Sequence, residues 1–286
     1  MFTAQWFSLG GGVVHPLMRR YIYEDVTLEN PQIVIDAYNP YEARFPNRTV
    51  ISREELHLIK TLRTNGIDYK IRSKYSSDLY VLSQKNFESL LIDPIFLTLY
   101  NLGIGIAASY VFKALNGAKE LNDKLFIKNK DGEVFDYQGK PLSQETIKHV
   151  SNAMFKTQSD FAKTMASSSP YPELPHPVHL EHTARIVGWC NLVVDERGLK
   201  VDPMKVTCDE TWRRIQENDL QGMSIGGLIA KCRCSICGDS YIDCNHITGK
   251  KYDGQDCTCE IQSFDLAEIS VVCNPANNLC GINLSK

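Results

Sequence analysis

The spacing of apolar and polar positions predicts short strands and an amphipathic helix along residues 30–85. An apolar run at 32–38 lies between two prolines and predicts a strand. Ser52 and Glu55 have the spacing of a capping box, and apolar residues follow at helical intervals, so a helix is expected to begin there and end at Gly66. Further strands are predicted at 67–74 and 78–83. Together these elements predict a small α/β module without catalytic residues.

An uncharged segment at 95–112 has the composition of a buried or membrane-embedded helix. It is near the lower length limit for a membrane span, and its small residues recur at intervals that permit close helix packing. Three interpretations remain open: a helix of the soluble core, a helix that mediates oligomerisation, and a membrane anchor. Asn101 and two glycines weaken the membrane interpretation.

The pattern after this segment predicts a hairpin, a helix and a linker. Asp131-Gly132 is typical of a hairpin turn, and Ser143 is expected to begin a helix that runs to about Thr164. The Ser- and Pro-rich stretch 167–177 is the best linker in the chain. We therefore predict an α+β protein with a small α/β module at 1–90, an apolar helix, hairpin and helix region at 91–166, the linker at 167–177, and a C-terminal domain at 178–286 that carries an insert at 232–259.

Composition indicates an ordinary globular protein in a reducing compartment. The chain has 286 residues, a net charge of −3 and a hydrophobic fraction of 43%. Its length suits one or two domains, and its charge gives no reason to expect nucleic-acid binding. None of the ten cysteines precedes Cys190, and their clustering favours metal binding over disulfides. Residues 1–7 lack a signal-peptide pattern, so a cytoplasmic location is expected.

The insert at 232–259 has the spacing of a metal site. Its ligand candidates are Cys234, Cys237, Cys244, His246 and Cys257, with Cys232 and Cys259 as further thiols beside them. Four of the five candidates suffice for a tetrahedral Zn²⁺ shell, which leaves no open position for chemistry and is therefore structural. We expect Cys244 to be left out, because a Cys-x-His pair seldom directs both side chains at one ion.

Ser224 and His182 are candidates for nucleophilic chemistry. Ser224 lies between small residues in Gly222-Met-Ser-Ile-Gly226, and a serine needs a base within hydrogen-bond reach to become a nucleophile. His182 is the predicted base and His179 its competitor; if both lie on one strand, residues three apart face opposite sides and only one can face Ser224. Glu268 is the candidate to orient the imidazole, with pairing to an Arg or Lys as the alternative.

The order of these segments resembles the prohead maturation proteases of tailed phages, which share the herpesvirus assemblin fold. The similar segments are His182–Trp189, Asp195–Val201, Glu210–Leu220 before the Gly-x-Ser-Ile-Gly stretch, and Asp265–Asn277. The cysteine-rich insert departs from this pattern; its own spacing resembles a zinc-binding motif of phage and mobile-element proteins. The N-terminal part of the chain has no counterpart in the resemblance.

The resemblance implies a β-barrel with helices and a serine endopeptidase that uses Ser224, His182 and Glu268. Its protein substrates would be scaffold- or capsid-like, or another phage or host protein, as in capsid maturation or anti-phage defence, and it would cleave itself as well. A homo-oligomer or larger assembly is expected. Zinc is expected to tie the strand of Ser224 to that of Glu268 and so to hold the site in shape. The alternative is a non-catalytic assembly or docking protein that presents the zinc element as an interaction surface.

Overall fold

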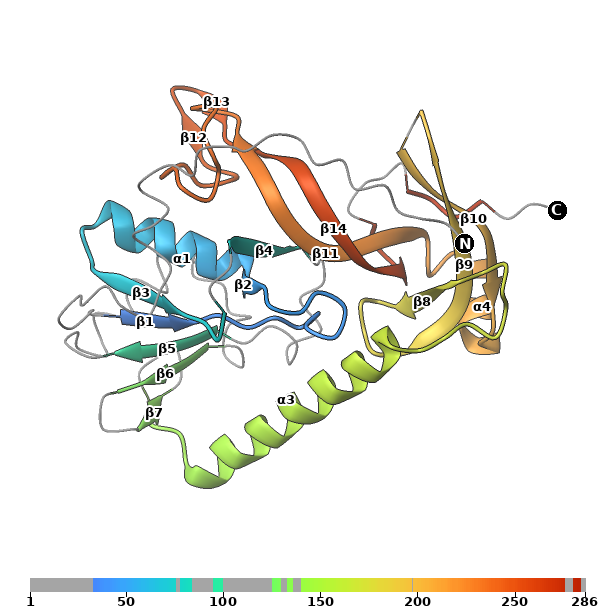
Figure 1. Ribbon diagram of the computed structural model, residues 1–286, viewed down its shortest axis with the longest axis horizontal. Coiled ribbons are helices and arrows are strands. Elements are labelled where there is room, and N and C mark those ends of the chain that lie inside the picture. The colour runs from blue at the N-terminus through green and yellow to red at the C-terminus, as the bar shows by residue number, and fades with distance from the viewer. Residues whose placement is uncertain are drawn as a thin grey trace.

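The protein is a mixed α+β structure built mostly from strands (Figure 1). The computed structural model describes residues 33–75, 78–83, 95–99, 125–129, 133–135, 140–196, 198–275 and 280–283. These residues form a seven-stranded sheet, a five-stranded sheet and a two-stranded ribbon.

The seven-stranded sheet carries the candidate chemistry. In spatial order its strands are β10 (Gly198–Val206), β9 (Ile186–Asp195), β8 (His176–Leu180), β14 (Cys259–Val272), β11 (Gly222–Cys234), β4 (Leu79–Ser83) and β2 (Thr49–Ile51). In the described part of the chain this sheet is open, with β10 and β2 at its edges. The closed barrel predicted from the sequence is therefore wrong, because β2 and β4 extend the sheet beyond β11 and its two edges do not pair.

The five-stranded sheet belongs to the N-terminal half. Its strands in order are β3 (Tyr69–Arg72), β1 (Ile33–Asp36), β5 (Ile95–Leu99), β6 (Leu125–Lys128) and β7 (Val134–Phe135). The strands expected at 32–38, 67–74 and 78–83 are confirmed as β1, β3 and β4. The hairpin pairing of β6 with β7 is also confirmed, although its turn at Asp131-Gly132 lies outside the described residues.

The prediction of a helix at 95–112 is wrong for the first residues of this segment. Residues 95–99 form β5, which pairs antiparallel with β1 and parallel with β6. An apolar run of this length fits a buried strand as well as a helix, so periodicity alone does not separate the two. The rest of the segment lies outside the described residues. In the described part of the chain, no helix has both the length and the apolar character needed to cross a membrane.

Helix α1 (Arg53–Thr64) is confirmed at both ends. Ser52 accepts a hydrogen bond from the Glu55 backbone, and the Glu55 carboxylate accepts one from the Ser52 backbone, which completes the capping box. At the other end Gly66 has φ +66°, and the bonds from Gly66 N to Arg63 O and from Ile67 N to Leu62 O form a Schellman motif. Local sequence alone therefore fixes the length of α1.

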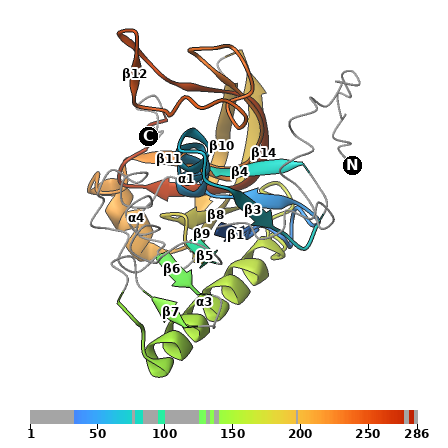
Figure 2. The same ribbon diagram turned by 90° about the vertical axis from the view of Figure 1, so that its left-hand side faces the viewer.

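Two further helices flank the large sheet. Helix α3 (Gln144–Met165) begins after its N-cap Ser143, as predicted, and runs along the lower side of the molecule in Figure 1 and Figure 2. Helix α4 (Asp209–Gln216) precedes β11. Residues 167–175 form an irregular connection, and β8 begins at His176, inside the predicted linker.

Strands from both sides of the predicted linker share one sheet. β4 pairs antiparallel with β11 from Gly227↔Ser83 to Ile229↔Val81, and β2 pairs parallel with β4. One buried cluster joins α1 side chains such as Leu58 to Ile229 of β11 and Cys257 of the insert. The N-terminal elements thus support the sheet that carries the C-terminal chemistry.

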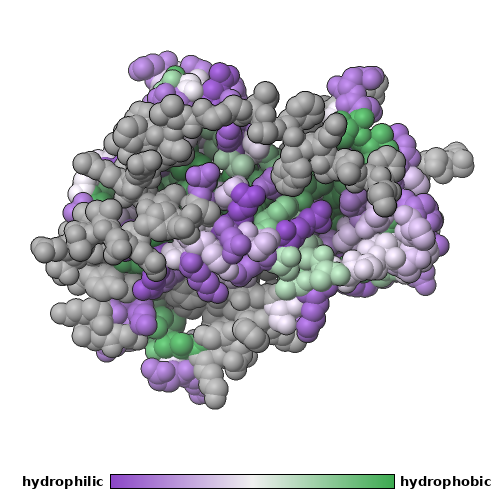
Figure 3. Space-filling model, in the orientation of Figure 1, coloured by the Kyte–Doolittle hydropathy of each residue, from purple (hydrophilic) through white to green (hydrophobic). Residues whose placement is uncertain are grey.

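The hairpin of β9 and β10 is the most exposed apolar feature of the described residues. Val193, Val194 and Leu199 are exposed large hydrophobic residues on it, and Figure 3 shows hydrophobic residues where this hairpin lies in Figure 1. Contiguous exposed apolar side chains are typical of contact surfaces.

Candidate active site and metal centre

Ser224, His182 and Glu268 form one chain of hydrogen bonds. The His182 Nε2 atom lies 3.0 Å from Ser224 Oγ, and His182 Nδ1 is bonded to Glu268 Oε1. A carboxylate only accepts hydrogen bonds, so Nδ1 carries the proton and Nε2 is left as the acceptor for the Ser224 hydroxyl. This geometry allows His182 to take the Ser224 proton while Glu268 stabilises the resulting imidazolium.

Strand register places the serine and the carboxylate on one face of the sheet. β11 and β14 pair antiparallel, with Ser224 opposite Ser270 and Gly226 opposite Glu268. Side chains alternate between faces, so all four positions share the same face. β8 continues this face, because His179 lies opposite Ser270 in the parallel pairing of β8 with β14.

His182 reaches this face from a tight turn. Sequence reasoning treated His179 and His182 as residues of one strand, which is wrong: β8 ends at Leu180. Glu181 and His182 have φ values of +49° and +57°, a left-handed conformation that costs energy for residues other than glycine. The turn reverses the chain after β8, so His179 on β8 and His182 in the turn do not follow strand alternation.

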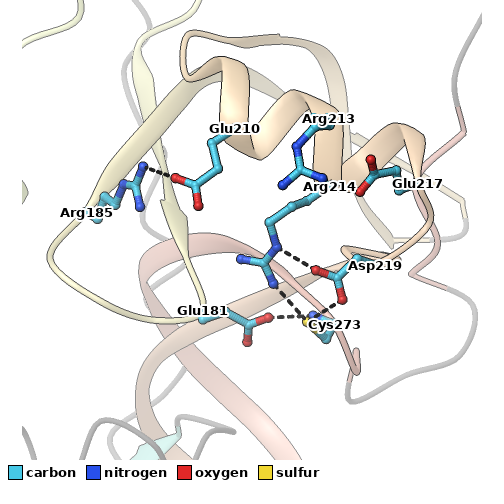
Figure 4. A network of polar contacts seen from close by, with 8 residues as sticks. All are labelled: Glu181, Arg185, Glu210, Arg213, Arg214, Glu217, Asp219 and Cys273. Carbon is cyan, nitrogen blue, oxygen red and sulfur yellow. Dashed lines mark hydrogen bonds and ion pairs between the residues drawn. The ribbon is translucent and has the colours of Figure 1, made fainter.

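Polar contacts from α4 and the end of β14 hold this turn (Figure 4). The Glu181 carboxylate accepts a 2.6 Å hydrogen bond from Cys273 N. Arg185, at the other end of the turn, bonds Glu210 of α4 at 3.0 Å. The bond to backbone is the stronger constraint, because the Arg185–Glu210 pair is exposed and such pairs contribute little.

His179 supports the turn from within. Its Nδ1 lies 2.8 Å from Thr183 O, and because a carbonyl oxygen only accepts, Nδ1 is the donor. Burial lowers the pKa of His179, which favours the neutral form of the ring. Its ring lies 5.8 Å from that of Phe161 in α3. The structure therefore places His182, and not His179, against Ser224.

Ser270 is a site residue that sequence reasoning missed. Its hydroxyl donates to Glu268 Oε2 at 2.7 Å, and its oxygen accepts the His182 backbone N–H at 3.1 Å. One side chain thus fixes both the carboxylate and the strained turn. The alternation Glu268-x-Ser270 on a strand was the available signal, because it places both residues on the same face.

The three residues of the candidate site are buried. His182 has 0% exposed surface, Glu268 3% and Ser224 8%. Tyr41 is fully buried, and its hydroxyl lies so near Gly226 that a Cβ at this glycine would overlap both Tyr41 Oη and Glu268 Oε1. Gly226 is therefore required by the close approach of the carboxylate and the tyrosine.

Four predicted ligands meet in the insert. The ligand atoms of Cys234, Cys237, Cys244 and His246 all lie within 4.8 Å of one another. His246 Nδ1 is buried and has no hydrogen-bond partner among the described residues, as expected of a nitrogen whose lone pair faces an ion. These residues fit a tetrahedral metal ion with sulfur and nitrogen ligands.

The expectation that Cys244 stands apart is wrong. The turn at Ser240–Cys244 is tight, with hydrogen bonds from Asp243 N and Cys244 N to Ser240 O, and it lets both Cys244 and His246 face the cluster. Cys257 is outside this group of four, although its Sγ lies 3.9 Å from that of Cys234. Cys257 is thus the predicted candidate that lies beside the group of four.

Backbone amides favour the ionised form of the first ligand. Burial raises the pKa of Cys234, but hydrogen bonds from the backbone of Cys237 and Ile236 outweigh it and lower the pKa to about 6. Burial raises the pKa of Cys237 and that of Cys257 to about 11 each. The turn that follows Cys234 therefore directs N–H groups at its sulfur, which stabilises the thiolate form that metal ions bind.

The insert connects β11 to β14 at the end of their ribbon that lies away from Ser224. β11 runs to Cys234 and β14 begins at Cys259, opposite it. Within the insert, β12 (Lys251–Tyr252) and β13 (Gln255–Asp256) form the small two-stranded ribbon. The two strands that carry Ser224 and Glu268 are already paired along their length, so their alignment does not depend on a clip at the cysteines alone.

Comparisons of this chain with models of known protein families, with curated proteins and with solved structures found no match.

Replacing Gly226 with alanine is predicted to destabilise the protein by about 1–3 kcal/mol, because the added methyl group must displace Glu268 or Tyr41. Thermal unfolding measures the loss. Gly281→Ala is the matched control, since the nearest atom to its added Cβ is 4.0 Å away. Equal melting temperatures for the two variants would contradict the close approach described here.

Proposed function

We propose that this protein is a serine endopeptidase with Ser224 as nucleophile and His182 as general base. The observation that carries the proposal is the position of one imidazole between Ser224 Oγ, 3.0 Å away, and the Glu268 carboxylate. The resemblance of the C-terminal segments to prohead maturation proteases supports a protein substrate and self-cleavage. An assemblin-like arrangement of strands and helices, without a closed barrel, is included in the proposal for this part of the chain.

The chain's own residues account for each proton in such a reaction. Ser224 Oγ attacks the scissile carbonyl as its proton passes to His182 Nε2, and Glu268 holds the imidazolium through Nδ1–H. His182 then returns the proton to the leaving amine, which departs and leaves an acyl-enzyme on Ser224. Water attacks this ester with His182 again as base, which releases the acid product and restores the Ser224 hydroxyl.

Zinc is proposed as the ion of the insert, held by Cys234, Cys237, Cys244 and His246. Thiolate and imidazole ligands in a tetrahedral arrangement favour Zn²⁺ in a reducing compartment. Four protein ligands leave no open position, so bound zinc would supply folding free energy rather than chemistry. The insert at 232–259 is therefore assigned a structural role.

Burial of the candidate site favours a second function. A general base must exchange protons with substrate, and His182 has 0% exposed surface in this structure. A buried and fully hydrogen-bonded Ser–His–Glu group also serves as a polar core network. The second candidate is thus a non-catalytic assembly or docking protein that presents the zinc element to a partner.

A fluorophosphonate probe separates the two functions. We predict that the probe labels Ser224, and that Ser224→Ala abolishes labelling and self-cleavage, because loss of the nucleophile typically removes at least about 10³-fold of the rate. Labelling and cleavage are followed by intact mass at high protein concentration. Ser263→Ala, a substitution on β14 away from the site, should behave as wild type. Folded wild-type protein that never reacts would favour the docking function.

Ser270→Ala is predicted to lower kcat by roughly tenfold to a hundredfold, because Glu268 and the turn of His182 each lose a hydrogen bond. KM should change little, since Ser270 is fully buried and does not contact substrate. The pH profile of kcat/KM should shift as well, because Glu268 orients the base. An unchanged profile, together with an unchanged kcat, would show that Ser270 has no positioning role.

The purified protein is predicted to hold about one zinc ion per chain. Cys234→Ser should lose it and unfold the insert, because metal binding and folding are linked in such sites. Elemental analysis and hydrogen exchange at 235–258 measure the two effects. Cys280→Ser removes an exposed thiol outside the insert and should keep the metal. Full zinc content in Cys234→Ser would exclude the proposed ligand set.

A further inference from the structure

Helix α1 places a lysine directly against the metal-binding cluster. Lys60 has 0% exposed surface. Its Nζ donates to His246 O at 2.6 Å and lies 3.5 Å from Cys244 Sγ. The same ammonium lies 3.3 Å from the centre of the Tyr241 ring. Three residues of the insert therefore surround the end of one side chain from the N-terminal half.

Such a lysine requires a negative partner. Moving an ammonium group out of water is costly unless an opposite charge and hydrogen bonds compensate. None of the ion pairs formed by the described residues gives Lys60 a carboxylate. The groups near it that can become anionic are the thiols of the cluster, and Cys244 is in direct contact.

Metal binding would supply that negative charge. A divalent ion held by three thiolates and one neutral imidazole leaves the cluster with one net negative charge. We infer that Lys60 is the counter-ion of this cluster and thereby couples metal loading to the docking of α1. The inference rests on the proposed metal site and is independent of the proposed peptidase activity.

Contacts of Arg63 also align α1 with the insert. Arg63, one turn after Lys60 on α1, donates to Asp243 O at 2.5 Å and to Cys244 O at 3.4 Å. In Figure 1 and Figure 2, α1 lies between the five-stranded sheet and the β12–β13 end of the insert. Backbone carbonyls of the ligand-bearing turn therefore meet α1, and the counter-ion is held in place by the helix.

The charge of Lys60 fits the composition of the cluster. One ammonium balances the single negative charge of a divalent ion held by three thiolates and a neutral histidine. The group of Cys234, Cys237, Cys244 and His246 has this composition. Lys60 thus acts as a positioning residue that joins α1 to the cluster.

The test measures zinc affinity in the full chain by competition with a chromophoric chelator under reducing conditions. Lys60→Met removes the charge, and Lys60→Gln removes the charge but keeps a donor for His246 O. Both are expected to weaken zinc binding by roughly 10- to 100-fold, the usual effect of losing a group that supports metal ligands. Lys251→Met, which removes an exposed charge from the same insert, should leave the affinity unchanged.

Two further readouts separate a counter-ion from a packing residue. In the zinc-loaded protein, Lys60→Met should lower the melting temperature. In the metal-free protein, the same substitution should leave the melting temperature unchanged or raise it, because it removes the unpaired ammonium charge of Lys60. Cobalt-loaded wild type should show the absorption of a tetrahedral site with three thiolates.

Wild-type affinity in Lys60→Gln would show that only the hydrogen bond matters and would overturn the inference. An equal drop in melting temperature with and without metal would also overturn it. Wild-type protein that binds no zinc or cobalt would overturn the metal site itself, and with it the counter-ion. The peptidase proposal is tested separately, by labelling of Ser224 with the serine probe, so the failure of one proposal is distinguishable from the failure of the other.

Discussion

The antiparallel pairing of β11 with β14 is the interaction on which both candidate sites depend. Its register runs from Gly222↔Val272 to Cys234↔Cys259. Because side chains alternate along a strand, this register sets Ser224 beside Ser270 at one end and brings the first cysteine ligand to the mouth of the insert at the other. A one-residue slip would turn Ser224 to the opposite face and separate it from Glu268. The register is therefore a requirement of the chemistry and not only of the core.

Local signals in the sequence were enough for elements with defined ends. The capping box at Ser52 and the glycine at 66 determined α1, because caps depend on residues within one turn. The spacing of cysteines and histidine predicted the Cys/His cluster for the same reason, because its residues lie close together in the sequence. Non-local pairing was beyond reach: nothing in residues 79–83 indicates that β4 joins β11, or that the sheet stays open. The turn at His182 was missed because its left-handed residues are not glycines.

Burial explains why the group of Ser224, His182 and Glu268 needs Ser270 as a fourth member. Glu268 has two oxygens, and an unpaired buried carboxylate oxygen is costly. His182 satisfies Oε1 and Ser270 satisfies Oε2, so the network is complete within the protein. The same bonds compensate for the strained backbone of the turn, because Ser270 also accepts the His182 N–H. A site with this degree of pairing is rigid, which suits either a preorganised catalyst or a polar core.

The N-terminal elements connect the two candidate sites from the side of the β11–β14 ribbon. Ser224 and Cys234 are ten positions apart on β11, which corresponds to roughly 30 Å of strand. Register shifts between them, at Gly226/Gly227, at Ile229/Lys231 and at Lys231/Cys232, locally disrupt the pairing of the ribbon. β4 pairs with β11 at 227–229, between the two sites, and α1 holds the insert through Lys60. β4 therefore contacts the ribbon between the two candidate sites, and α1 contacts the insert at its end. In this arrangement the N-terminal elements are a structural link between the Cys/His cluster and Ser224, whereas the sequence predicted them only as a module without catalytic residues.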